Sequence, residues 1–136
     1  MSAETQRPCI LIVDDDQDVV AYLDTLLADN GYHTICAAGG DEALELAREH
    51  RPDLICLDIS MPAPTGVKVY RTLRDDPQLG TIPVVIITGV EREFEQFIKT
   101  RRQVPPPDGY HRKPFDPEEV LDTVRKILGE REATTH

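Results

Sequence analysis

The chain has 136 residues, of which 29% are charged and 40% hydrophobic, a balance typical of one globular domain and not of a disordered segment. Its net charge of −10 argues against direct binding to nucleic acid or to an anionic membrane. Neither a secretion signal nor a membrane-spanning apolar run is present, so we expect a cytoplasmic protein. Cys9, Cys36 and Cys56 each lie in an apolar segment, which predicts three core thiols.

The first half of the chain alternates apolar runs with helical patterns. Cys9–Val13 is a continuous apolar run, which predicts a buried parallel strand, and it stops abruptly at three aspartates, Asp14 to Asp16. Apolar residues then recur at helical spacing as far as Asn30-Gly31, a pair typical of a helix C-terminus. The other elements expected here are a strand over 32–38 and a helix that opens at Gly39 and ends before Pro52.

The second half repeats this alternation. Apolar runs over 54–57 and 84–87 predict two more buried strands, which end at Asp58 and Thr88, and Lys113 follows a last strand expected over 109–112. The helices expected here cover 67–76, 91–104 and 117–129, the last with Asp116 as its N-cap. Five strand-helix units predict a doubly wound parallel α/β domain over residues 8–129, between a flexible tail over 1–7 and a short tail over 130–136.

The polar residues that follow these strands are expected to meet. The carboxyl ends of parallel strands share one edge of the sheet, where open sheets bind ligands. Asp14, Asp15 and Asp58 would repel one another there, because two unit charges at 4 Å interact with about 4 kcal/mol at an effective dielectric of about 20. A hard divalent cation with oxygen ligands offsets this repulsion, and such a ligand set suits Mg²⁺.

Such a site favours phosphoryl chemistry. Asp58 can act as a carboxylate nucleophile toward a phosphoryl group, while Lys113 neutralises its charge and Thr88 donates a hydrogen bond. Each residue alone has a simpler explanation, because Asp14 to Asp16 can cap a helix, Asp58 can be a loop residue, Thr88 a turn hydroxyl and Lys113 a surface lysine. We favour the site because four separate strand ends carry the chemistry that it needs.

The same segments resemble the receiver domain of two-component response regulators over about residues 8–129. The matching motifs are Ile12-Val13-Asp14-Asp15, Leu57-Asp58-Ile59-Ser60-Met61-Pro62 with Gly66, Pro83 through Gly89, and Tyr110 through Phe115. The resemblance implies a flavodoxin-like fold, with a five-stranded sheet in the order 2-1-3-4-5 and five helices. It also implies a signalling switch that catalyses only its own phosphoryl transfer and dephosphorylation, not a turnover enzyme.

The resemblance assigns a role to each site residue. Asp58 would be phosphorylated by the phosphohistidine of a sensor histidine kinase or of a phosphotransfer protein. Mg²⁺ would be held by Asp15, Asp58 and the backbone carbonyl of Ser60, with Asp14 acting through water. Thr88 and Lys113 would contact the phosphoryl oxygens, and the Lys113-Pro114 peptide bond would be cis.

The resemblance also implies an output device. Tyr110 stands where the family keeps an aromatic switch, and its ring would turn inward as Thr88 moves to the phosphoryl group. This movement would alter the face formed by the fourth helix, fifth strand and fifth helix. The alternative is a half-buried strand tyrosine that never moves.

The chain departs from the family pattern before the last strand. Twenty-five positions lead from Thr88 to Lys113, slightly more than in a compact receiver, and the extra length coincides with a stiff triproline at 105–107. Phe94 and Phe97 lie in this stretch, as core anchors or as a partner-binding patch. The cognate kinase, the output partner and homodimerisation stay open.

Three rival functions follow from the same residues. A degenerate receiver that binds partners without phosphorylation would fit the altered stretch, although the acceptor residues are intact. An aspartate-nucleophile phosphatase would want a second acid two residues after Asp58, where Ser60 stands. A flavin-binding domain would need a phosphate loop after the first strand, and none follows it.

Overall fold

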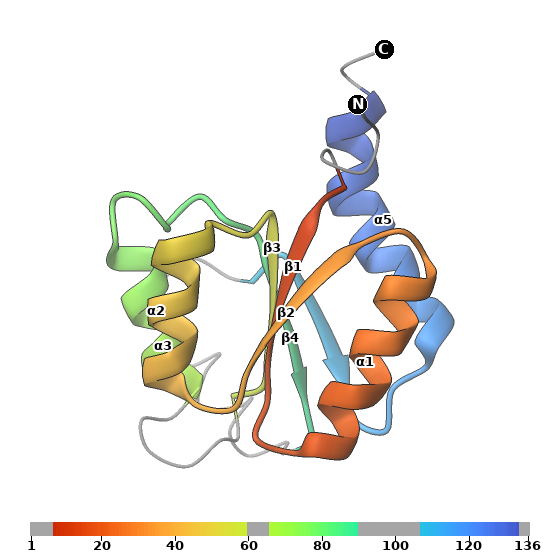
Figure 1. The fold of residues 1–136 in the computed structure, drawn as a ribbon, viewed down its shortest axis with the longest axis horizontal. Helices are drawn as coiled ribbons and strands as arrows, with labels where there is room; N and C mark the ends of the chain where they lie inside the picture. Colours follow the sequence, from red (N-terminus) through yellow and green to blue (C-terminus); the bar gives the residue numbers. More distant parts are fainter. Residues whose placement is uncertain (1–6, 60–65, 90–106, 134–136) are drawn as a thin grey trace.

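The fold is a five-stranded parallel sheet with helices on both faces (Figure 1). The computed structural model describes residues 7–59, 66–89 and 107–133. The strands are β1 (Cys9–Val13), β2 (His33–Ala37), β3 (Leu54–Leu57), β4 (Val84–Thr88) and β5 (Gly109–Arg112). The helices of the described ranges are α1 (Gln17–Asp29), α2 (Gly40–His50), α3 (Gly66–Asp75) and α5 (Pro117–Ala133).

The strand order is β2-β1-β3-β4-β5, with every neighbouring pair parallel, which confirms the predicted sheet. The sequence predicts five helices, and the described part of the chain contains four of them. The remaining one, expected over 91–104, lies outside the described residues, as do Phe94 and Phe97.

Alternate strand residues pack on opposite faces of the sheet. Leu11 and Ile55 face α2 and α3, whereas their neighbours Ile10 and Cys56 face α1 and α5. Figure 1 shows the two helix pairs on opposite sides of the strands. Because both faces are covered, every residue of β3 and β4 is buried, which explains their continuous apolar sequences.

Two predicted helix starts are confirmed, and one predicted end is wrong. Asp16 caps α1 by accepting hydrogen bonds from the amides of Asp18 and Val19. Asp116 likewise accepts a bond from the amide of Glu118 at the start of α5. Helix α5 continues through Gly129 to Ala133, because one glycine disfavours a helix by only about 1 kcal/mol and good helix formers follow it.

The cysteine prediction holds for one of the three residues. Cys56 is buried in central strand β3, whereas Cys9 and Cys36 are only partly buried, and all three are free thiols. Cys9 begins its strand and Cys36 lies on edge strand β2, so neither is covered from all sides. Among the described residues, none of the helices has the length and apolar character needed to cross a membrane.

Candidate functional site

Backbone hydrogen bonds beyond the strand ends fix the candidate site. The amide of Asp14 donates to the carbonyl of Ala37 at 3.1 Å, and the amide of Asp58 donates to the carbonyl of Val13 at 3.0 Å. The amide of Lys113 donates to the carbonyl of Thr88 at 2.9 Å. Asp14, Asp58 and Lys113 therefore each continue the hydrogen-bond ladder of the sheet by one step, and they lie at its carboxyl edge, as the sequence predicts.

Three aspartates form an acidic cluster at this edge. One carboxylate oxygen from each of Asp14, Asp15 and Asp58 lies within 4.8 Å of the others. Asp14 and Asp58 are 2% and 3% exposed, whereas Asp15 is exposed to solvent. Buried carboxylates need a compensating cation, and oxygen donors at this spacing fit a hard divalent ion. The residues present therefore suit the predicted Mg²⁺.

Lys113 supplies the positive charge nearest to this cluster among the described residues. Its Nζ lies 2.7 Å from Oδ2 of Asp14 and 3.4 Å from Oδ2 of Asp58. The other oxygen of Asp14, Oδ1, accepts a hydrogen bond of 2.9 Å from the amide of Asp16. The ammonium is thus held mainly by Asp14 and approaches Asp58 less closely.

The pKa values of the site reflect burial and unbalanced charge. Burial raises the pKa of Asp14, and the nearby charge of Asp58 acts in the same direction, against the donors on Lys113 and Asp16. Burial alone would lower the pKa of Lys113, but its hydrogen bond to Asp14 and the charges of Asp58 and Asp14 raise it overall. Lys113 therefore stays protonated beside the carboxylates.

The remaining predicted residues lie at or near the same edge. Thr88 is fully buried at the end of β4, and it is paired in register with Arg112. Tyr110 is half-buried on β5 opposite Ile86, and it packs against the core on the α2 and α3 side. The Lys113-Pro114 bond is cis, as the resemblance implies. Ser60 lies outside the described residues.

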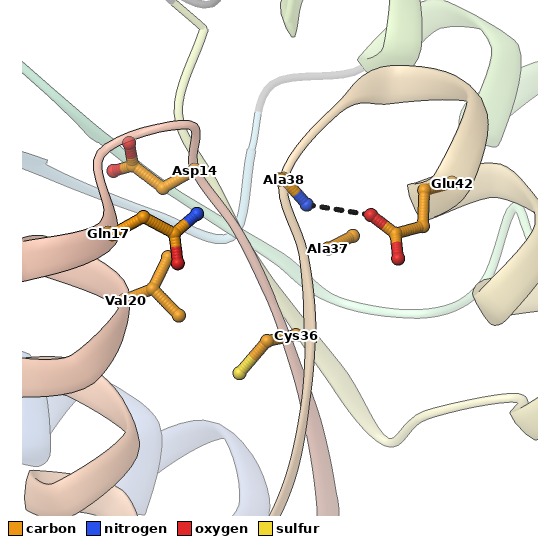
Figure 2. Close-up of a pocket in the computed structure, with 7 residues that line it drawn as sticks. All are labelled: Asp14, Gln17, Val20, Cys36, Ala37, Ala38 and Glu42. Carbon is orange, nitrogen blue, oxygen red and sulfur yellow. Dashed lines mark hydrogen bonds between the residues drawn. The ribbon is translucent and has the colours of Figure 1, made fainter.

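A small hollow adjoins Asp14 on the β2 side of the edge (Figure 2), and sequence reasoning did not find it. It measures about 150 Å³, with Gln17 of α1 on one side and Glu42 of α2 on the other. Oε1 of Glu42 accepts a hydrogen bond of 3.0 Å from the amide of Ala38. The strand order could have indicated this hollow. Gln17 and Glu42 lie in the first turns of helices that follow the neighbouring strands β1 and β2.

Known proteins with similar sequences are response regulators. Residues 10–125 match the family described as the response regulator receiver domain. The chain is 35% identical over 121 residues to the polar-differentiation response regulator DivK of Brucella anthropi, covering 89% of this chain and 96% of DivK. It is also 36% identical over 119 residues to the alkaline phosphatase synthesis transcriptional regulatory protein PhoP of Bacillus subtilis.

The PhoP match covers 88% of this chain but 48% of PhoP, so the chain spans about half the length of that relative. Among solved structures, the chemotaxis response regulator CheY4 of Vibrio cholerae superposes with a TM-score of 0.78 at 31% identity. That match covers 89% of this chain and 98% of CheY4. The family match, the curated relatives and the shared fold agree, and the chain belongs to the receiver domains of two-component response regulators.

Proposed function

We propose that this receiver domain is a phosphoacceptor switch in which Asp58 accepts a phosphoryl group from the phosphohistidine of a sensor histidine kinase or of a phosphotransfer protein. The observation that carries the proposal is the meeting of Asp58 with Asp14, Asp15 and Lys113 at the carboxyl edge. This gathering of charges is an observation separate from the family match and the fold. Carboxylates and a lysine are groups that proteins use to handle phosphoryl groups.

Mg²⁺ is the cofactor that we propose for this site. Asp15 and Asp58 would bind it directly, Asp14 would act through water, and the carbonyl of Ser60 would complete the protein ligands. The exposure of Asp15 supports this assignment, because Mg²⁺ keeps several of its waters and needs an open side. When bound, the ion would supply charge neutralisation for the carboxylates and the incoming phosphoryl oxygens.

Three side chains would each have a separate role in the phosphoryl transfer. An Oδ atom of the Asp58 carboxylate can form the bond to phosphorus without a general base. The bond between phosphorus and the donor's imidazole nitrogen breaks, and that nitrogen keeps the electron pair. Lys113 would neutralise one phosphoryl oxygen, and the hydroxyl of Thr88 would donate to another.

We further propose that the output follows the Thr88 and Tyr110 pair toward the face of β5 and α5. Their positions support this, since Thr88 ends β4 and Tyr110 lies on the adjacent strand β5. Residues 91–104, where the sequence predicts the fourth helix of this face, lie outside the described residues.

The proposal is tested by the intact mass of the protein after incubation with Mg²⁺ and a small acyl phosphate. We expect one phosphoryl adduct on the wild type and none on Asp58→Asn, because the amide is not a nucleophile here. Asp41→Asn, which removes an exposed acid of α2, is the matched control and should form the adduct. Chelation of Mg²⁺ should abolish it.

The alternatives give different outcomes in the same assay. A wild type that never gains the adduct would indicate a degenerate receiver that acts without phosphorylation. An adduct that persists in Asp58→Asn would place the acceptor elsewhere. Continuous release of phosphate from unrelated phosphomonoesters would instead indicate an aspartate-nucleophile phosphatase.

A further inference from the structure

The hollow between α1 and α2 is a feature that the proposed function does not use (Figure 2). The end of edge strand β2 lines it with Cys36 and Ala37, followed by Ala38, and Val20 adds an apolar wall from α1. Its volume is about 150 Å³, and a cavity of that volume can hold a group of about the size of benzene. The hollow can therefore take the end of one side chain.

Two polar side chains approach this hollow from opposite sides (Figure 2). Oε1 of Glu42 accepts the amide of Ala38 at 3.0 Å, which fixes the carboxylate on the β2 side. Within the described ranges, neither the second oxygen of Glu42 nor the side-chain amide of Gln17 has a hydrogen-bond partner. The hollow thus offers one acceptor that is held in place and a second polar group across from it.

The charge around the hollow is negative. The residues that line it in the described part of the chain include the carboxylates of Asp14 and Glu42 but no lysine or arginine. Lys113 lies 2.7 Å from Asp14 and so offsets the charge of that residue, not of Glu42. Burial raises the pKa of the Cys36 thiol, and the charges of Asp24 and Glu42 raise it further. A cation is therefore the ligand that this hollow favours.

We propose that the hollow binds the arginine side chain of a protein partner, with the guanidinium between Glu42 and Gln17. A guanidinium is planar and carries five donors, so it can donate to the carboxylate and to the amide oxygen at the same time. It is also weakly hydrated, which suits the apolar wall at Val20, whereas the ammonium of lysine is compact and strongly hydrated. This docking site goes beyond the proposed function, because it requires no phosphoryl group on Asp58.

The size and the rim of the hollow favour a side chain of a protein over a free small molecule. Pockets for small molecules usually measure about 300 to 1,000 Å³, whereas a guanidinium with two methylene groups is about the size of benzene. Asp16, Asp18 and Asp41 are exposed acids at the starts of the two helices. These acids would repel the α-carboxylate of free arginine, which an arginine within a protein lacks.

The test is a titration of the whole ¹⁵N-labelled chain, followed by NMR, with the capped peptide acetyl-Gly-Arg-Gly-amide at about 0.15 M salt, which screens non-specific attraction. We expect the largest shifts at the side-chain amide of Gln17 and at the backbone amides of Ala37 and Ala38. The peptide with lysine should bind at least about fivefold more weakly. The peptide with citrulline, which keeps the shape but not the charge, should not bind. Equal binding of the three peptides, or shifts that avoid these amides, would overturn the proposal.

Two substitutions change the charge of the hollow in opposite directions. Glu42→Gln keeps an oxygen for the amide of Ala38 but removes the charge, and it should weaken binding of the arginine peptide about tenfold. Gln17→Glu, in the first turn of α1 where an acid is favourable, should tighten binding about threefold. Glu45→Gln and Thr25→Glu make the same charge changes at exposed positions of the same helices outside the hollow, and each should change affinity by less than about twofold.

The control variants separate a docking site from general attraction by an acidic protein. If Glu45→Gln weakened binding as much as Glu42→Gln does, net charge alone would explain the affinity, and the site would be overturned. Free arginine provides the last comparison, and we expect it to bind at least about threefold more weakly than the capped peptide. Tighter binding of free arginine would assign the hollow to a small molecule and overturn the protein partner.

Discussion

Two ionic clusters occupy opposite edges of the sheet, and they are built differently. The acidic cluster at the carboxyl edge sets three aspartates against Lys113. The Arg74 cluster, at the amino edge, consists of Arg74, Tyr70 and Asp108, with the backbone around them. Its guanidinium lies 2.9 Å from Oδ2 of Asp108, which also accepts the amide of Val84 at the start of β4.

The guanidinium of Arg74 donates hydrogen bonds to several partners at once. It donates to the hydroxyl of Tyr70 at 3.1 Å and to the carbonyls of Gly80 and Ile82 at 3.0 and 2.8 Å. The side chain is 8% exposed, and its charge is matched one to one by Asp108. The balanced pair leaves no unpaired buried charge as long as both partners are present, whereas the excess of acids at the other edge leaves a site that a further cation can complete.

The largest effect that we expect is the loss of stability in Arg74→Met. The substitution leaves two carbonyls and Asp108 without their charged donor, which should lower the free energy of unfolding by about 3 kcal/mol. Arg48→Met is the matched control, because Arg48 is 54% exposed and 3.7 Å from Asp76, and it should change stability by less than about 0.5 kcal/mol. Urea unfolding measures both, and equal losses would show that the Arg74 cluster contributes no more to stability than an exposed ion pair does.

The next prediction is that removing one carboxylate changes the free energy of unfolding in opposite directions at the two edges. Without Mg²⁺, Asp58→Asn should raise the free energy of unfolding by about 1 kcal/mol, because it relieves repulsion among the three aspartates. Asp108→Asn should lower it, because Arg74 loses its counter-charge. Thermal unfolding with a chelator present compares the two variants, and a loss of stability in both would show that the acidic cluster is compensated as fully as the Arg74 cluster.

The sequence predicted the acidic cluster because its parts follow from local patterns. Continuous apolar runs that stop abruptly locate the buried strands, and parallel pairing brings their ends to one edge. The last strand was predicted with its observed bounds, Gly109–Arg112, because prolines punctuate both sides of it. The strand ends also suggested the roles of Asp58, Thr88 and Lys113, and the resemblance added the phosphohistidine donor, the metal contact of the Ser60 carbonyl and the Tyr110 switch.

The Arg74 cluster could not be predicted in the same way. Two of its acceptors are backbone carbonyls of Gly80 and Ile82, whose orientation depends on how the chain turns between α3 and β4. For the same reason the sequence brought Lys113 to the edge but did not indicate that Asp14 holds it more closely than Asp58 does. Partner choice among neighbouring oxygens is decided by tertiary geometry.

The smallest effect concerns His111 on β5, a titratable group whose ring contacts a neutral partner and belongs to neither cluster. Its Nε2 lies 2.8 Å from Oγ1 of Thr123, and that hydroxyl donates to the carbonyl of Glu119, so the ring nitrogen is the donor. Burial lowers the pKa of His111, and the charge of Glu119 only partly opposes this. The folded protein therefore binds fewer protons than the unfolded chain around the ordinary histidine pKa of about 6.5.

It follows that His111 lowers stability as the pH falls through this range, and that the loss is absent above it. We expect the urea midpoint to decrease slightly from pH 7.5 to pH 5.5, and His111→Gln to remove part of that decrease. His33→Gln, at an exposed position at the start of β2, should leave the pH dependence unchanged. If His111→Gln keeps the full decrease, His111 is not its source; the raised pKa of Asp14 cannot explain the decrease either, because a carboxyl with a raised pKa in the folded state favours folding as the pH falls.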